Sequence, residues 1–183
     1  MTYEEKFDRR RGNVTIDAPS RMARVLAFLA IGLAALFLLW GVLAYGLSWE
    51  TQARFWRDIF DRPGGPMSFR FILQPTMATI AALHDGIADA RSGRRPYLHT
   101  ILTDPAARAG RTMEGLYAIS RIILLGFAMD AIYQWRELGT FFPAEAVVIT
   151  LILAVIPYVI LRGPIARIAR WWFARHSQQQ SQE

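Results

Sequence analysis

The chain contains no cysteine, and its only lysine is Lys6. The absence of cysteine excludes disulfides, thiolate metal ligands and cysteine nucleophiles. The 183 residues also lack the motifs of nucleotide-binding loops, serine hydrolases, zinc peptidases and dithiol redox proteins. The sequence therefore predicts no catalytic residue, no bound metal and no cofactor. The missing motifs do not exclude a membrane enzyme, because membrane enzymes often lack them.

Charged side chains are missing from one long stretch, Val25 to Trp49, which holds 25 consecutive uncharged residues. A helix needs about 20 such residues to cross the hydrocarbon core of a bilayer. The apolar core of a cleaved signal peptide is shorter, about 7–15 residues, and lies nearer the start of the chain. The stretch therefore predicts a membrane anchor that is retained.

The basic residues are almost all arginines, and the net charge is +6. In a soluble protein this balance would suggest nucleic acid as a partner. Arginines that flank apolar runs instead indicate contact with anionic lipid headgroups. We therefore expect the bilayer as a partner and no nucleic acid. The preference for arginine over lysine is typical of a GC-rich bacterial genome, which favours a multi-pass protein of the bacterial inner membrane.

The apolar segments predict an all-α integral membrane protein. Its four expected transmembrane helices are 22–47, 67–84, 113–136 and 143–161. The second of them has only 13 uncharged residues in a row, Phe71 to Leu83, which cover about 20 Å of a core roughly 30 Å thick. This segment either crosses as a short span or enters and leaves the membrane on one side.

Arginine and lysine counts distinguish these two alternatives. With four spans, 15 basic residues lie on the side of the two termini and 5 on the other side. If 67–84 does not cross, the counts become 7 and 13. Because cytoplasmic segments carry the excess of basic residues, we predict four spans with both termini in the cytoplasm.

Two amphipathic segments are predicted to lie on the membrane surface. Residues 48–60 place Trp49, Ala53, Trp56 and Phe60 on one helical face, and residues 164–175 combine isoleucine and tryptophan with arginine. Arg162-Gly163-Pro164 is expected to end the last span before the second segment. Residues 1–20 and 176–183 are predicted to be disordered, and 21–175 to form a single helical domain.

A polar cluster follows the second expected span. It consists of His84, Asp85, Asp89, Arg91, Arg94 and Arg95. One interpretation is a set of ion pairs that orders a cytoplasmic loop, and another is a site for a lipid headgroup or other ligand. A divalent-metal site is the third, although no second ligand motif accompanies it.

Four polar residues fall within the expected spans: Gln74, Arg121, Asp130 and Gln134. A charge at the bilayer centre costs about 2.5–3.5 kcal/mol on insertion scales, so each charge needs a partner or a function. Arg121 and Asp130 are nine residues apart, which puts them on opposite faces of one helix. Asp130 is therefore expected to be protonated, bonded to Gln74, or paired with an arginine of a partner subunit.

Small residues recur at every fourth position of one segment, at Ala78, Ala82, Gly86 and Ala90. Such a row lets another helix approach closely within a membrane. The neighbouring helix can belong to the same chain, to a second copy or to a different protein.

These patterns favour a non-catalytic inner-membrane protein that acts through helix packing. It would be an accessory or assembly subunit of a membrane complex, or a self-associating scaffold, with a second copy or another membrane protein as its partner. A second hypothesis is a small oligomeric transporter or channel in which Asp130, Gln74 and Arg121 line a path. A third is a phospholipid-handling enzyme that uses Asp85 and Asp89.

Overall fold

The computed structural model describes residues 19–46, 48–65 and 67–179, and no β-strand occurs among them. The elements are α2 (Arg21–Tyr45), α3 (Trp49–Asp61), the 3-10 turn η1 (Arg62–Gly64), α4 (Arg70–Arg91), α5 (Tyr97–Thr103), α6 (Pro105–Tyr133), the π-helical turn η2 (Gln134–Leu138), α7 (Pro143–Thr150), the π-helical turn η3 (Leu151–Val155) and α8 (Ile156–Gln179). The predicted all-α class is confirmed for these residues. The segment 1–18, within the stretch expected to be disordered, lies outside the described residues.

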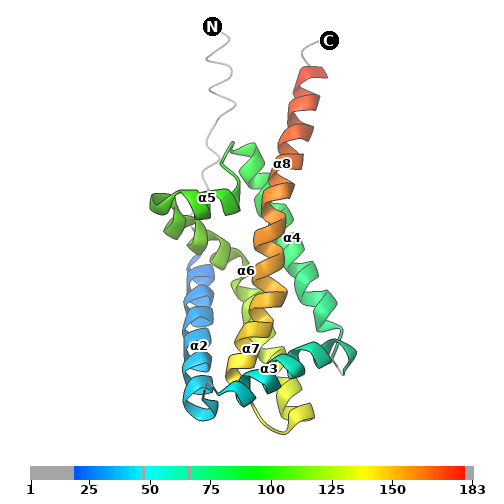
Figure 1. Cartoon of the computed structure of the whole chain (residues 1–183). Coiled ribbons are helices and arrows are strands. Elements are labelled where there is room, and N and C mark those ends of the chain that lie inside the picture. The colour runs from blue at the N-terminus through cyan, green and yellow to red at the C-terminus, as the bar shows by residue number, and fades with distance from the viewer. Residues whose placement is uncertain (1–18, 47, 66, 180–183) are drawn as a thin grey trace.

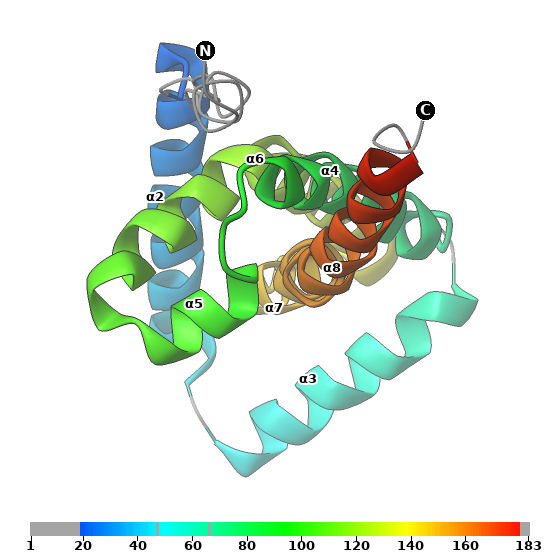
Figure 2. The same ribbon diagram turned by 90° about the horizontal axis from the view of Figure 1, so that it is seen from above.

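The long helices form an antiparallel bundle (Figure 1). α2 and α6 run in one direction, whereas α4 and the rod formed by α7, η3 and α8 run in the other. α5 lies at one end of the bundle and α3 crosses the other, and these are called the α5 end and the α3 end below. Seen from above, α4, α6 and α8 stand close together, while α3 lies along one side (Figure 2).

Three helices are long and apolar enough to cross a membrane: Arg21–Tyr45, Pro105–Leu138 and Pro143–Arg175. They contain most or all of the predicted spans 22–47, 113–136 and 143–161, and they indicate a membrane protein. α4 corresponds to the second predicted span, 67–84, but it is not one of the three.

The start of α6 follows directly from its sequence. Asp104 caps the helix, because its Oδ1 accepts hydrogen bonds of 3.1 Å from the backbone N–H groups of Ala106 and Ala107. Pro105 occupies the first turn, where a missing N–H costs nothing. The pair Asp104-Pro105 therefore marks the start of this long helix.

The helix end predicted at Arg162-Gly163-Pro164 is wrong. α8 continues through Gly163 and Pro164 to Gln179, so 164–175 is not a separate surface helix but the C-terminal part of α8. Pro164 removes one backbone hydrogen bond, while α4 packs along α8 on both sides of this point. α8 also includes 176–179 of the expected disordered tail, and 180–183 lie outside the described residues.

The row of small residues on α4 is used within the chain. Ala78, Ala82, Gly86 and Ala90 are all buried, and α8 is the main neighbour of α4. A Cβ added at Gly86 would lie 2.7 Å from Ile165 Cγ2 and 3.0 Å from the Arg162 carbonyl oxygen. Of the three possible neighbours, the structure therefore supplies a helix of the same chain.

The amphipathic pattern of α3 matches its exposure. Ala53, Trp56 and Phe60 are exposed on the predicted apolar face, as is Trp49. Ile59 on the other side is buried in a cluster with residues of α7 and η3. The segment 48–60 is thus confirmed as a helix with an exposed aromatic face.

Candidate functional site

Charged side chains from three helices meet at the α5 end of the bundle. This α5-end charge cluster consists of Asp85, Asp89, Arg94, Arg111, Glu114 and Arg162, from α4, α6 and α8 and from the loop after α4. Asp89 is buried at its centre. Arg162 donates to both of its carboxylate oxygens, from Nε at 2.8 Å and from Nη2 at 3.1 Å. Arg111 does the same at 3.0 Å from each terminal nitrogen.

Glu114 and Asp85 complete the cluster. Glu114 accepts hydrogen bonds from Arg162 at 2.5 Å, from Arg94 at 3.0 Å and from Arg111 at 3.1 Å. Asp85 accepts one from the Tyr158 hydroxyl at 2.5 Å. Three arginines face three carboxylates, so the cluster is electrically neutral. This geometry supports the interpretation of the cluster as a set of ion pairs. It gives no support to a metal site.

Aromatic rings enclose the cluster on one side. The Arg162 guanidinium lies 4.3 Å from the centre of the Tyr97 ring, a cation–π geometry. Gly115 makes room for this ring, because a Cβ there would collide with the Tyr97 hydroxyl. Burial raises the pKa of Tyr97 above its ordinary value, so its hydroxyl stays neutral.

The sequence-predicted ligand cluster is brought together only in part. Asp85, Asp89 and Arg94 lie in the charge cluster. His84 is exposed and lies 3.2 Å from Asp85, whereas Arg91 faces the ring of Phe173 at 5.7 Å. Of Arg95, only the backbone carbonyl takes part, as an acceptor for Arg111.

A second polar group lies inside the bundle at the α3 end. This α3-end polar cluster consists of Arg70, Gln74, Asp130, Gln134 and Thr150, all buried. Arg70 Nη1 lies 2.5 Å from Asp130 Oδ1. Gln134 donates to Asp130 Oδ2 and to the Phe142 carbonyl oxygen, and its own amide oxygen accepts from the Phe142 N–H.

These contacts correct two expectations about Asp130. Its arginine partner belongs to the same chain and not to a partner subunit. The expected bond from Gln74 is also wrong, because the Gln74 amide nitrogen is buried without a hydrogen-bond partner. Arg70 Nη2 and Thr150 Oγ1 are buried without one as well.

Arg121 is separated from this cluster. It lies on the exposed side of α6, together with Leu125 and Ile132, whereas Asp130 faces the interior. The opposite faces predicted for Arg121 and Asp130 are confirmed. Arg121, Gln74 and Asp130 consequently do not line one path within a single chain.

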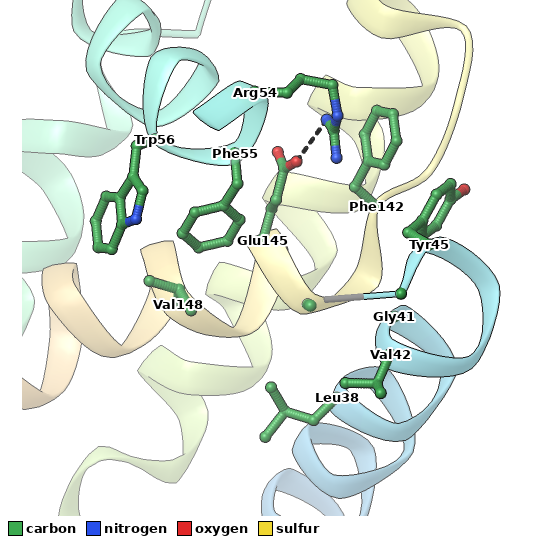
Figure 3. A pocket seen from close by; sticks show the side chains of 12 residues that line it. Leu38, Gly41, Val42, Tyr45, Arg54, Phe55, Trp56, Phe142, Glu145 and Val148 are labelled. Carbon is green, nitrogen blue, oxygen red and sulfur yellow. Dashed lines mark hydrogen bonds and ion pairs between the residues drawn. The ribbon is translucent and has the colours of Figure 1, made fainter. Parts of the chain in front are cut away.

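A groove of about 300 Å³ opens between α2, α3 and α7 at the α3 end (Figure 3). Its polar part is an ion pair, in which Arg54 Nη1 lies 2.8 Å from Glu145 Oε1. The Glu145 side chain is only 2% exposed and the Arg54 side chain 34%. The Arg54 guanidinium also lies 3.7 Å from the centre of the Phe142 ring. We call this feature the α2–α3–α7 groove, and no sequence motif indicated it.

Comparison with known proteins identifies no relative. No protein-family model matches the chain, and no curated protein or solved structure is significantly similar to it. Within residues 19–46, 48–65 and 67–179, no three or more histidine, aspartate or glutamate side chains are grouped to hold a metal ion. The function must therefore be inferred from the geometry.

Proposed function

We propose that this is a non-catalytic protein of the bacterial inner membrane that acts through helix packing, as an accessory or assembly subunit or a self-associating scaffold. The proposal rests on the ion pairs that the buried acidic side chains form. Asp89, Asp130 and Glu145 are each buried against an arginine of the same chain. A carboxylate held in this way is not available as a general base or a metal ligand. Asp85 and Asp89 accordingly give little support to a phospholipid-handling enzyme.

The proposal includes α4 as a fourth transmembrane helix. Its 22 residues cover about 33 Å, enough for a bilayer core of about 30 Å. Three polar residues of α4, Arg70, Gln74 and Asp89, are buried in the interior, while Ile72 and Ile80 are 74% and 62% exposed. A helix surrounded by water would show the reverse pattern. Because α4 runs parallel to α8, this topology puts both termini on one side, which the arginine distribution assigns to the cytoplasm.

The outer face of α2 is the surface we propose for a partner. α2 rests on α6 and α7 through small residues, with Ala27, Ala30 and Gly41 buried. Its other faces expose large apolar side chains such as Phe28 and Leu36. The small residues of α4 are occupied by α8, whereas α2 is the least buried of the three helices that are long enough to span, so its apolar face is open to another membrane protein.

Native mass spectrometry after gentle extraction tests the proposal. We expect the chain to appear with a second copy or with another membrane protein. Ala35→Phe adds bulk on the exposed side of α2 and should remove that partner, whereas Thr76→Phe on the exposed side of α4 should not. A wild-type chain that appears only as a monomer, with no co-purifying protein, would rule the proposal out.

A transport function is the second candidate, and one observation favours it. The unpartnered polar atoms of Arg70, Gln74 and Thr150 lie within the bundle beside Asp130, where an ion or a proton would need such groups. Asp130→Asn should then abolish flux in proteoliposomes while the protein still assembles. Unchanged flux would exclude this candidate.

A further inference from the structure

We propose that the α2–α3–α7 groove binds one glycerophospholipid, with the lipid phosphate at Arg54 and an acyl chain between α2 and α7. This goes beyond the proposed function, because a scaffold needs no specific lipid site. The groove combines an apolar lining with the partly exposed guanidinium of Arg54, which matches the two halves of a phospholipid.

The apolar half is built from residues on both sides of the opening. Leu38 and Val42 of α2 face Val148 of α7 across the groove (Figure 3). Gly41 lies between them, and a Cβ there would meet Ala144 Cβ at 2.6 Å. The close contact of Gly41 with Ala144 therefore brings α2 and α7 together at the base of the groove. The volume of about 300 Å³ is at the lower end of the range for small-molecule sites, sufficient for part of one acyl chain.

The polar half is the guanidinium of Arg54. A guanidinium carries five N–H donors in a fixed plane, so it can hold Glu145 and also donate to a phosphate oxygen. The buried Glu145 carboxylate and the Phe142 ring fix its position. Because about one third of the Arg54 side chain is exposed, a ligand can reach it without breaking this pair.

The position of the groove favours a membrane lipid over a soluble phosphate compound. α3 lies at the end of the bundle opposite to the end of α8 (Figure 1), and its exposed Trp49, Trp56 and Phe60 are typical of the headgroup region. Arg54 on the same helix is then at the level of the lipid phosphates. Leu38 and Val42 precede Tyr45 on α2, so the apolar lining extends from that level toward the membrane core.

The experiment compares two lipids with the same acyl chains, phosphatidylglycerol and diacylglycerol, which differ in the phosphate headgroup. Each is titrated into the purified full-length protein in detergent, and bound lipid is counted by native mass spectrometry. We expect one phosphatidylglycerol per chain, bound about tenfold more tightly than diacylglycerol, which is the size of a single charge-assisted contact. Equal binding of the two lipids would overturn the phosphate assignment.

Three variants locate the site. Val42→Trp fills the groove and should weaken phosphatidylglycerol binding at least about tenfold. Leu43→Trp is its matched control, since Leu43 is 77% exposed and does not line the groove, and it should bind as the wild type does. Arg54→Lys keeps a cation opposite Glu145, so it avoids an unpaired buried acid. It should reduce the preference for phosphatidylglycerol while diacylglycerol binding stays the same.

The alternative outcome is annular lipid only. In that case several lipids would bind per chain, and Val42→Trp would bind as many as Leu43→Trp. Thermal unfolding of all variants, followed by circular dichroism, shows whether each is folded. If Val42→Trp does not fold, an unchanged lipid preference in Arg54→Lys is sufficient to reject the proposal.

Discussion

Arg162 binds Asp89 through two hydrogen bonds, from Nε to Oδ2 and from Nη2 to Oδ1, although the two residues are 73 positions apart. Both side chains are only 1% exposed. The pair joins α8 to α4 directly before Gly163 and Pro164, where α8 would otherwise be weakest. Arg111 of α6 binds the same carboxylate, so one acid connects three helices.

We expect Asp89→Ala to lower the free energy of unfolding by about 3–5 kcal/mol, because it leaves Arg111 and Arg162 buried without their common acceptor. Unfolding by sodium dodecyl sulfate in mixed micelles measures this quantity. Arg167→Ala is the control on the exposed side of α8, and it should change the value by less than about 0.5 kcal/mol. Equal losses in the two variants would contradict the connecting role of Asp89.

Gly126 provides a test of packing in the α3-end polar cluster. A Cβ at this position would collide with the Gln74 amide nitrogen and would lie 2.6 Å from Thr150 Cγ2. We therefore expect Gly126→Ala to destabilise the protein by about 1–3 kcal/mol, the usual cost of overpacking. Gly32→Ala is the matched control, since nothing lies within 4 Å of its added Cβ. It should leave stability unchanged or raise it by up to about 1 kcal/mol. The same unfolding assay compares the two variants. If Gly126→Ala were as stable as Gly32→Ala, α4 and α7 would be able to move apart without cost.

The sequence predicts local features of this fold well. Uncharged runs locate α2 and the rod of α7 and α8, and Asp104-Pro105 locates the start of α6. The spacing of Trp49, Trp56 and Phe60 gives the exposed face of α3. Each of these depends on interactions within a few residues, which a single sequence contains.

The partners in the two clusters depend on tertiary contacts and could not be predicted in this way. The sequence indicates Asp89 as a candidate, but Arg111 and Arg162 come from helices that meet it only after folding. Arg162 follows an apolar run, so a membrane boundary is the simplest local explanation for it. The same ambiguity made Gly163-Pro164 the expected end of a span, because the support that α4 gives to α8 has no local pattern.

The pair of Arg70 and Asp130 allows a structural role to be separated from a functional one. We expect Arg70→Met and Asp130→Leu each to destabilise the protein by about 3–5 kcal/mol, since each removes one partner of a buried ion pair. Combining the two removes both charges and should recover most of that loss, because replacing a buried ion pair by apolar residues is often neutral. A double-mutant cycle in the same unfolding assay measures the coupling. Additive losses would show that the two side chains do not depend on each other.

The path of α4 can be determined with single cysteines, since the natural chain has none and gives no background labelling. Glu50, His99 and Thr140 are exposed in segments that separate the long helices. If α4 crosses the membrane, cysteines at 50 and 140 react with an impermeant maleimide added to whole cells. A cysteine at 99 then reacts only after the membrane is permeabilised. If α4 returns to the side from which it entered, positions 50 and 99 react alike and position 140 lies on the opposite side. Labelling of 50 and 140 from one side therefore requires four crossings, with the charge cluster around Asp89 at the cytoplasmic surface and the α2–α3–α7 groove in the outer leaflet.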